Sequence, residues 1–522
     1  MVFEDTVCLR SRKTRECDLS QIGHIGYENR PDNSMQRPTF LESELKMADN
    51  INVPRIVLAA LKGGAGKTFI TVGLAAALRR RGLSLAMFKK GPDYIDAGWL
   101  GLAAGCNCYN LDAYLFEQDV VTDSFLKRCA GSQAALIEGN RGLFDGVDSM
   151  GRYSTAELAK LLKAPVIIIV DATKMTRTAA ALVLGCKVLD PDLAIQGVIL
   201  NRVGGARHEK VLGESIENVC SIPVLGSVGK IAVEHFPQRH LGVLPSYEHP
   251  QAQGFLEEAA DVVERSVDLD CLLEIASCAE VLAPRDDLEL FRDKPALYAG
   301  LKIGVLKDSA FQFYYPENLE VLSATGAELV EISALEPMRL PPIDALYIGG
   351  GFPETHAGIL AQNSVFKESI RDAVEGGLPV YAECGGLMYL SKSLRIDDRV
   401  YPMVGVFPVD TVLERKPQGH GYIHVEVSGI NPFFQIGTSL TGHEFHYSYV
   451  TPIREHDASY AFKVLRGHGM DGMHDGICKY NALGTYVHLH ALGAPLWADG
   501  ILARAKDFSK GLNKHGKSNS FA

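Results

Sequence analysis

Long hydrophobic runs are missing from this sequence. No stretch of its 522 residues approaches the roughly 18 apolar residues of a membrane helix, and its first residues lack the apolar core of a signal peptide. We therefore expect a cytoplasmic protein without a membrane partner.

Positive charge is also in deficit, since 52 Lys and Arg stand against 63 Asp and Glu, for a net charge of −11. Nucleic-acid binding needs a surplus of Lys and Arg on one face, so we expect no nucleic-acid partner. The 11 cysteines are odd in number and include no C-x-x-C pair, which argues against a disulfide framework and against a zinc site. Because the net charge is negative, an anionic ligand must be held by local basic groups.

The remaining composition is that of a globular protein, with 47% hydrophobic and 22% charged residues. At roughly 100–200 residues per domain, the length predicts two to four domains. Residues 1–53 are polar and lack periodicity, so we interpret them as a disordered extension, with Met47 as a candidate natural start.

Residues 54–250 alternate short apolar runs with amphipathic stretches, which is typical of a parallel sheet covered by helices. Strands are predicted at Ile56–Ala60, Leu85–Phe88, Ala134–Ile137, Pro165–Val170 and Ile195–Leu200. Residues 251–299 have helical spacing and are expected to form a linker. A second α/β domain is predicted over 300–495, followed by a C-terminal tail over 496–522. Its strands are expected at Leu301–Leu306, Ala345–Ile348 and Leu378–Ala382.

A glycine-rich segment, L-K-G-G-A-G-K-T, follows the first predicted strand and ends at Thr68. Such a turn into a helix presents backbone N–H groups to phosphate. Lys67 would neutralise the β and γ phosphates of ATP, and the Thr68 hydroxyl would hold Mg²⁺. The glycines of this predicted ATP site are Gly63, Gly64 and Gly66.

Lys62 gives the segment the deviant form K-G-G-x-G-K-T, which is shared by ATPases related to chromosome-partitioning and septum-site proteins. In those relatives the extra lysine reaches the nucleotide of a neighbouring subunit. A partitioning-type ATPase switch without ligase chemistry is therefore an alternative of another class.

The segment from Phe88 to Asp96 reads F-K-K-G-P-D-Y-I-D, and here the sequence resembles the cobyrinic acid a,c-diamide synthase family, whose members carry F-K-x-G-P-D-Y-I-D. The resemblance extends from Arg55 to about Leu492. It implies a P-loop amidoligase domain similar to dethiobiotin synthetase, joined to a triad-type glutamine amidotransferase domain. Further matches are Asn110-Leu111-Asp112, Glu138-Gly139, Gly142-Leu143-Phe144-Asp145-Gly146, Ser154-Thr155-Ala156 and Asn201-Arg202.

A carboxylate at a strand end beside a P-loop is where a Mg²⁺ ligand belongs, which makes Glu138 the candidate. The resemblance places Asn201 near the adenine. Asp93, Tyr94 and Asp96 are a candidate substrate or metal site, whose aspartates either bind Mg²⁺ or orient the reacting carboxylate and ammonia, and their spacing does not separate these roles. Four basic residues are candidate substrate contacts, and each could equally be solvated surface charge: Lys89, Lys90, Arg141 and Arg202.

In the second domain, a buried strand runs into A-E-C-G-G, which places Cys384 on a sharp turn before a helix. We expect an exposed thiol whose thiolate the helix N-terminus stabilises, as in triad-type glutamine amidotransferases. Upstream, a glycine run follows another strand. Its N–H groups and that of Gly385 could stabilise an oxyanion. The candidates in that run are Gly350 and Gly351.

His488, in Y-V-H-L-H, resembles the family's segment and is the candidate base for Cys384. Ordinary amidotransferases have His-x-Glu here, whereas this chain has His490 at the third position. The orienting carboxylate is therefore absent or comes from elsewhere. The cluster G-H-E-F-H, ending at His446, lacks zincin spacing and is given no catalytic role.

Together, these sites imply that glutamine cleavage supplies ammonia, while ATP activates a carboxylate that the ammonia attacks. The resemblance implies a tetrapyrrole polycarboxylate, most simply cobyrinic acid, amidated on its a and c acetates with ATP, glutamine and Mg²⁺. No tightly bound organic cofactor is expected, and a homodimer is compatible with the family. The departures at Lys62 and Arg141 favour a second candidate within this class, an a,c-diamide synthase for sirohaem or sirohydrochlorin.

Overall fold

The computed structural model describes residues 52–230, 238–239, 242–243, 251–282, 297–452 and 458–516. The predicted extension over 1–53 therefore lies almost wholly outside the described residues, although Val53 is buried in a core. Residues Asp49–Ala522 form one compact unit. Within the described ranges, no helix is both long and apolar enough to cross a membrane.

The first part of the chain forms a seven-stranded sheet in the order β3-β2-β4-β1-β5-β6-β7. All of its strand pairs are parallel, as the alternation of apolar and amphipathic segments predicts. The strands are β1 (Arg55–Ala60), β2 (Leu85–Lys90), β3 (Cys108–Leu111), β4 (Ala134–Glu138), β5 (Val166–Asp171), β6 (Ile195–Val203) and β7 (Val224–Gly229). The helices between them are α1 (Lys67–Arg80), α2 (Ile95–Ala104), α3 (Gln118–Cys129), α4 (Thr155–Leu161), α5 (Thr178–Leu189) and α6 (Ala206–Cys220).

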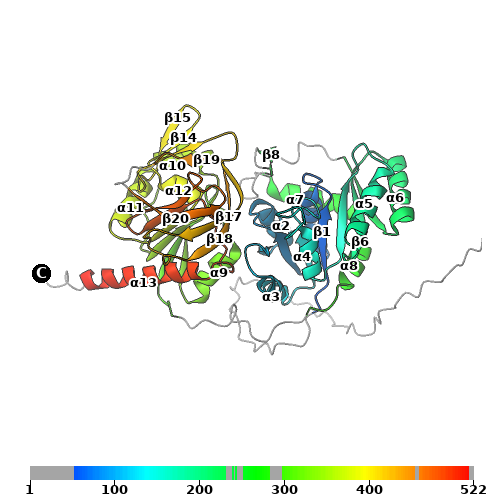
Figure 1. The fold of residues 1–522 in the computed structure, drawn as a ribbon, viewed down its shortest axis with the longest axis horizontal. Helices are drawn as coiled ribbons and strands as arrows, with labels where there is room; N and C mark the ends of the chain where they lie inside the picture. Colours follow the sequence, from blue (N-terminus) through cyan, green and yellow to red (C-terminus); the bar gives the residue numbers. More distant parts are fainter. Residues whose placement is uncertain are drawn as a thin grey trace, which may run out of the picture. The chain divides into compact units, whose positions relative to one another are not determined.

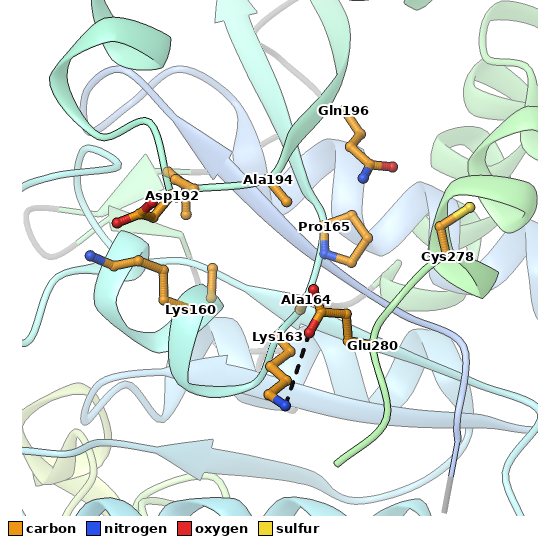
Figure 2. Close-up of a pocket in the computed structure, with 11 residues that line it drawn as sticks. Lys160, Lys163, Ala164, Pro165, Asp192, Ala194, Gln196, Cys278 and Glu280 are labelled. Carbon is orange, nitrogen blue, oxygen red and sulfur yellow. Dashed lines mark ion pairs between the residues drawn. The ribbon is translucent and has the colours of Figure 1, made fainter.

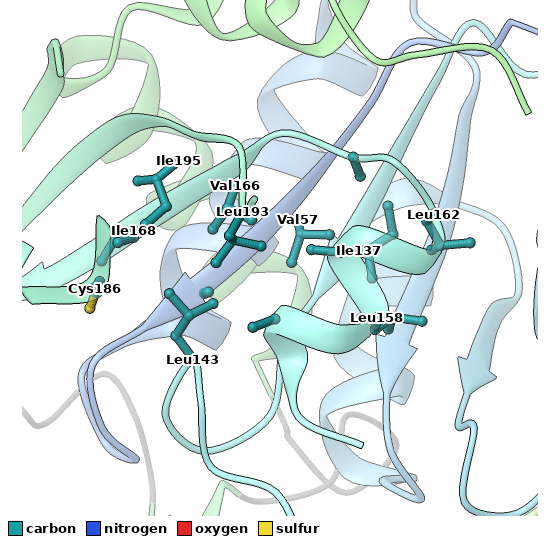
Figure 3. Packing of buried hydrophobic residues seen from close by; sticks show 14 of the residues in the cluster. Val57, Ile137, Leu143, Leu158, Leu162, Val166, Ile168, Cys186, Leu193 and Ile195 are labelled. Carbon is teal, nitrogen blue, oxygen red and sulfur yellow. The ribbon is translucent and has the colours of Figure 1, made fainter. Parts of the chain in front are cut away.

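The two faces of this sheet have separate hydrophobic cores. Alternate residues of a strand point to opposite faces, so Val57 packs in one core and Ile56 in the other. Figure 3 shows the first core, in which Val57, Ile137 and Val166 from three neighbouring strands meet Leu158 and Leu162. The central strands are thus buried on both sides, which explains their continuous apolar sequence.

Helices α7 (Ala252–Ser266) and α8 (Leu269–Ser277) lie in the first part of the predicted helical linker over 251–299, and they pack in the second core. Helix α7 packs along α1. It also lies beside α2 (Figure 1), where the rings of Trp99 and Phe255 meet with centroids 4.9 Å apart. The contact with α1 is close at Gly73, where an added Cβ would lie 2.6 Å from the carbonyl oxygen of Ala259. The segment is helical, as its spacing predicts, and its apolar face packs on the nucleotide domain. A short hairpin, β8 (Gln238–Arg239) with β9 (Gly242–Val243), precedes these helices.

The second part contains a nine-stranded sheet in the order β11-β10-β12-β13-β22-β21-β20-β17-β18. Its first five strands are parallel and the others antiparallel. The strands are β10 (Lys302–Leu306), β11 (Glu328–Ile332), β12 (Ala345–Ile348), β13 (Val380–Glu383), β17 (Gly419–Val427), β18 (Ser439–His446), β20 (Ser459–Arg466), β21 (His474–Lys479) and β22 (Ala482–Thr485). A smaller sheet holds β15 (Arg399–Pro402), β14 (Ser393–Ile396), β16 (Asp410–Leu413) and β19 (Ser448–Val450).

Helices of the second part cover the parallel half of the large sheet and complete two further cores. The last helix, α13 (Leu496–Gly516), forms most of the predicted C-terminal tail over 496–522. Its first turns bury Trp497, Ile501 and Leu502 in one of these cores. The other helical segments are α9 (Pro316–Ala324), η4 (Pro353–His356), α10 (Ala357–Gln362), α11 (Ser364–Glu375) and α12 (Gly385–Leu390).

Candidate active sites

The P-loop follows β1, the central strand of the first sheet, and ends in α1. Gly64 and Gly66 have φ of 72° and 91°, a left-handed conformation that favours glycine. A Cβ at Gly66 would also lie 2.2 Å from the Asn201 amide nitrogen. At Gly63 and Gly64 an added Cβ would meet no atom within 4 Å, so conformation favours glycine at Gly64 and Gly66, and close packing requires it only at Gly66.

Lys67 and Thr68 face the end of β4. The Lys67 ammonium donates to the Arg141 carbonyl oxygen at 2.8 Å, and the Thr68 hydroxyl donates to Glu138 Oε1 at 3.2 Å. The other oxygen, Glu138 Oε2, is buried and accepts no hydrogen bond within the described residues. An orphaned carboxylate oxygen beside a P-loop hydroxyl fits the few protein ligands that Mg²⁺ takes when it is also bound to phosphate.

Lys89 lies at the centre of a buried cluster of carboxylates. Its ammonium is 2.5 Å from Glu138 Oε1, 2.6 Å from Asp96 Oδ2 and 3.9 Å from Asp93 Oδ2. Burial opposes the charge, but the carboxylates outweigh it and raise the pKa of Lys89 well above its usual value. Lys89 is only 1% exposed, so the interpretation as solvated surface charge is wrong for this residue.

The carboxylates in this cluster titrate differently because their partners differ. Burial raises the pKa of Asp93, and the neighbouring Asp96 charge adds to the effect. Burial also opposes ionisation of Asp96, but the Lys89 ammonium outweighs it and lowers the pKa of Asp96. Asp93 Oδ1 accepts the Asp96 backbone N–H at 2.9 Å. Asp93 therefore also shapes the start of α2.

Asn201 touches the P-loop itself, because its amide donates to the Ala65 carbonyl oxygen at 2.8 Å. Nearby, Asp171 at the end of β5 pairs with Arg202 at 2.8 Å and with Lys62 at 3.4 Å. Lys62 is 64% exposed. Asp171 was not predicted, although its position at a strand end next to β1 follows the same rule that singled out Glu138.

The remaining predicted basic contacts differ in exposure. Lys90 is buried, and burial lowers its pKa against the opposing charge of Asp112. Arg141 is exposed and has a φ of 50°. Arg202 is 42% exposed. Solvated surface charge therefore remains a sufficient description for Arg141, but it does not fit Lys90.

In the second sheet, three neighbouring parallel strands end at the predicted amidotransferase residues. Cys384 follows β13, the glycine run follows β12 and His488 follows β22 by three residues. Strand β13 lies between the other two and pairs with both. The carboxyl ends of parallel strands share one edge, which brings these segments together.

Cys384 has the sharp backbone turn that the sequence predicts, with φ of 44° and ψ of −96°. The predicted exposure is wrong, because Cys384 is only 7% exposed. Burial raises the pKa of the Cys384 thiol, and the charges of Glu354 and Glu383 raise it further, against the Gly385 backbone N–H. The helix N-terminus does not offset burial, so the thiol needs a base to remove its proton.

The three predicted oxyanion glycines lie against one another. An added Cβ at Gly385 would lie 3.0 Å from the Gly351 nitrogen, and one at Gly350 would lie 2.7 Å from His488 Cε1. The glycine run thus touches both the residue after Cys384 and the His488 ring. The Gly350 carbonyl oxygen accepts the N–H groups of Gln312 and Phe313, which holds the run in place.

His488 is buried, and its Nδ1 lies 3.1 Å from Glu383 Oε2. The carboxylate that lies against His488 thus belongs to the residue before Cys384. His443 stacks on His488 with ring centroids 4.8 Å apart, and its Nδ1 is 3.1 Å from the Tyr315 hydroxyl. Burial lowers the pKa of His443 well below its usual value, so His443 is a neutral neighbour.

His490 lies apart from this pair. Its Nε2 is 3.6 Å from Glu317 Oε2, and its Nδ1 accepts the Leu492 N–H at 3.2 Å. In the G-H-E-F-H segment, Glu444 accepts the backbone N–H groups of His468 and Gly469. These bonds hold a turn, while His443 of the same segment is the residue that stacks on His488.

Tyr94 contacts the amidotransferase residues. Its ring stacks on Phe313 with centroids 5.3 Å apart, and it meets the edge of the His488 ring at 5.5 Å. The residues on either side of it in the motif, Asp93 and Asp96, belong to the carboxylate cluster around Lys89. Composition and spacing contain no signal for this contact.

A separate pocket is lined by Lys160, Lys163, Asp192 and Glu280 (Figure 2). It lies where β5 and β6 begin, since Pro165 and Gln196 also line it. Ligands of parallel α/β sheets bind at the carboxyl ends of the strands. The pocket is at the opposite edge from the P-loop and contains none of the predicted site residues.

Two family models match the chain, one on each part. The CobQ/CobB/MinD/ParA nucleotide binding domain matches residues 56–243, and the CobB/CobQ-like glutamine amidotransferase domain matches residues 302–495. Fold and sites thus define a glutamine-dependent, amide-forming ligase. A partitioning-type switch leaves the second match unexplained.

Curated relatives match most of the chain, across both parts. The chain is 44% identical to the cobyrinate a,c-diamide synthase of Magnetococcus marinus over 454 residues, which is 87% of this chain and 97% of that protein. It is 41% identical to the protein of the same name from Archaeoglobus fulgidus, over 85% of this chain and 95% of that one. The chain belongs to the cobyrinate a,c-diamide synthase family.

Proposed function

We propose that this protein converts the a and c acetate side chains of cobyrinic acid to carboxamides, using ATP and the amide nitrogen of glutamine. The observation that carries the proposal is the presence in one chain of two strand-end sites, the P-loop with Glu138 and the turn with Cys384. The names of the relatives support cobyrinic acid as the substrate and do not favour the sirohaem alternative.

The second site supports glutamine cleavage by covalent catalysis. Burial raises the pKa of the Cys384 thiol, and the proposal assigns His488 to take the thiol proton as sulfur attacks the glutamine carboxamide carbon. The N–H groups of Gly351 and Gly385 lie beside the nucleophile and would stabilise the oxyanion. The C–N bond then breaks, ammonia leaves with a proton from His488, and water hydrolyses the glutamyl thioester to glutamate.

The first site supports activation of the carboxylate. A carboxylate oxygen attacks the γ phosphorus of ATP, ADP leaves, and an acyl phosphate forms. The P-loop N–H groups and Lys67 would hold the phosphates and offset the repulsion between two anions. Ammonia then attacks the acyl carbon, the C–O bond to phosphate breaks, and the amide forms with loss of a proton.

The residues around Glu138 fit Mg²⁺. The Thr68 hydroxyl and the unpartnered Glu138 Oε2 would hold it, with Asp93 and Asp96 as neighbouring carboxylates. When bound, Mg²⁺ neutralises charge on the transferring phosphoryl group. The Asn201 amide donates to the Ala65 carbonyl oxygen and would hold the P-loop in place beside the nucleotide.

A product assay tests the substrate directly. The protein is incubated with ATP, Mg²⁺ and glutamine, and with cobyrinic acid, sirohydrochlorin or sirohaem in parallel, and each product is weighed by mass spectrometry. We expect cobyrinic acid to gain two amides, one at a time, with one ATP hydrolysed per amide. Amidation of sirohydrochlorin or sirohaem in preference to cobyrinic acid would contradict the proposal.

A further inference from the structure

Glu383 is a buried carboxylate directly before the nucleophile and is the last residue of β13. Its register partner on β22 is Thr485, three residues before His488. The chain after β22 therefore passes the end of β13, and the His488 Nδ1 comes to lie 3.1 Å from Glu383 Oε2. The His488 and Glu383 side chains are 3% and 0% exposed, so water does not weaken this contact.

Other groups hold the same carboxylate in position. The Tyr347 hydroxyl, on the neighbouring strand β12, donates to Glu383 Oε2 at 3.4 Å, and the Leu489 backbone N–H also interacts with it. Burial raises the pKa of Glu383, while the contact with His488 is the largest influence that lowers it. A carboxylate with these donors around it is a fixed acceptor for the Nδ1–H of the ring.

A fixed acceptor at Nδ1 determines what the other ring nitrogen can do. With the proton on Nδ1, Nε2 is unprotonated and can accept a proton from a thiol, and the nearby negative charge stabilises the imidazolium that results. The Cys384 thiol is buried and holds its proton, so its activation depends on such a base. His490, which stands where the usual pattern has Glu, carries no carboxylate, and its ring lies beside Glu317 instead.

We infer that Glu383 is the positioning residue of the amidotransferase site, taking the part that the carboxylate of the usual His-x-Glu pattern plays after the histidine. The inference rests on the proposed glutaminase function of Cys384 and His488. The orienting carboxylate has thus moved from the strand that carries the base to the strand that carries the nucleophile.

Glu383→Gln tests this role, because it removes the charge and keeps the size of the side chain. In the full-length protein we expect the glutaminase kcat to fall at least about 100-fold, with the KM for glutamine nearly unchanged. Amidation with free ammonia should keep the wild-type rate. Glu317→Gln is the matched control, since it neutralises an equally buried carboxylate next to His490, and it should leave the glutaminase kcat within about threefold.

Three outcomes overturn the inference: a Glu383→Gln glutaminase within about threefold of wild type, a loss confined to KM, or an equal loss in Glu317→Gln. If the Gln variant does not fold, Glu383→Asp decides. It keeps the charge one methylene further from the ring, so we expect a reduced kcat, and an unchanged kcat overturns the inference. Cys384→Ala is assayed in parallel. If that variant keeps glutamine-dependent amidation, the proposed function fails, whereas activity in Glu383→Gln alone removes only the role of Glu383.

Discussion

At the scale of single residues, the P-loop site depends on charges placed at strand ends. The Lys67 ammonium is buried and donates to the Arg141 carbonyl oxygen, whereas the Lys62 side chain is 64% exposed and pairs with Asp171. We therefore expect the two lysines of the K-G-G-x-G-K-T segment to differ in their importance for nucleotide chemistry.

We predict that Lys67→Ala lowers amidation at least about 100-fold with either glutamine or ammonia, because phosphate transfer precedes both. The measurement is the rate of amide formation by mass spectrometry with each nitrogen source. Lys62→Ala is the control, and its effect on the same rates should be smaller. Substantial ammonia-dependent product from Lys67→Ala would remove this lysine from the nucleotide site.

Lys89 supports a prediction on stability. Removing one partner from a buried ion pair costs about 3–5 kcal/mol, so Lys89→Met should lower the midpoint of urea unfolding at neutral pH. Lys163→Met is the control, because Lys163 is half-exposed and lies 4.0 Å from Glu280, and pairs of that kind contribute about 0–1 kcal/mol.

The pH dependence of this loss follows from the carboxylates. Lys89 lowers the folded-state pKa of Asp96, so their pairing stabilises the folded protein above the unfolded-state pKa and is lost as pH falls through the folded-state value. In Lys89→Met, the buried carboxylates lose their paired ammonium and keep only the smaller effect of the Lys67 charge on Asp96 and Glu138. Stability then falls as pH rises through their raised pKa values. The difference between variant and wild type should therefore be larger at about pH 8 than at about pH 5. A constant difference would contradict the cluster.

At the scale of elements, the packing of α7 on α1 completes one of the two cores of the nucleotide domain. The helical spacing over 251–299 indicated one apolar face, but spacing does not say which surface that face covers. In the structure it covers α1 at Gly73. The sequence of α13 likewise does not predict whether the helix packs on the domain. A terminal amphipathic stretch can be solvated or packed, and its sequence is compatible with both.

Gly73→Ala tests this packing. The added Cβ would lie 2.5 Å from Val263 Cγ2 and 2.6 Å from the Ala259 carbonyl oxygen, and overpacking of this kind costs about 1–3 kcal/mol. We expect a lower thermal midpoint. Gly213→Ala in α6 is the matched control, since its Cβ meets no atom within 4 Å and alanine favours a helix by up to about 1 kcal/mol. If both variants were equally stable, the close packing of α7 on α1 would be wrong.

At the scale of the whole molecule, the two sites carry out separate half-reactions. Cys384→Ala cannot form the glutamyl thioester, so amidation with glutamine should fall to background. Free ammonia at high concentration should restore amidation, because the P-loop site is unchanged. The measurement is the amidation rate with each nitrogen source. Loss of ammonia-dependent activity in a folded Cys384→Ala protein would contradict the independence of the sites.

Tyr94 is where the motif of one domain reaches the rings of the other. Aromatic contacts are each worth about 0.5–1.5 kcal/mol, so Tyr94→Ala should lower amidation with glutamine about 3- to 10-fold more than amidation with ammonia. Tyr94→Phe keeps the ring and should behave like wild type in this ratio. Equal losses of amidation with glutamine and with ammonia would show that Tyr94 acts only in the site that activates the carboxylate.

The sequence by itself determined the two α/β domains, the P-loop and the turn at Cys384, because these depend on local patterns: apolar runs, glycines and residues at strand ends. It also indicated Glu138, which stands at a strand end beside the P-loop, and His488, through the resemblance of Y-V-H-L-H to the family's segment. Only the tertiary structure paired Glu383 with His488, surrounded Lys89 with carboxylates, buried the Cys384 thiol and placed α7 on α1. These features depend on the order of strands in the sheet and on which surfaces meet, and both are set by contacts between residues far apart in the chain.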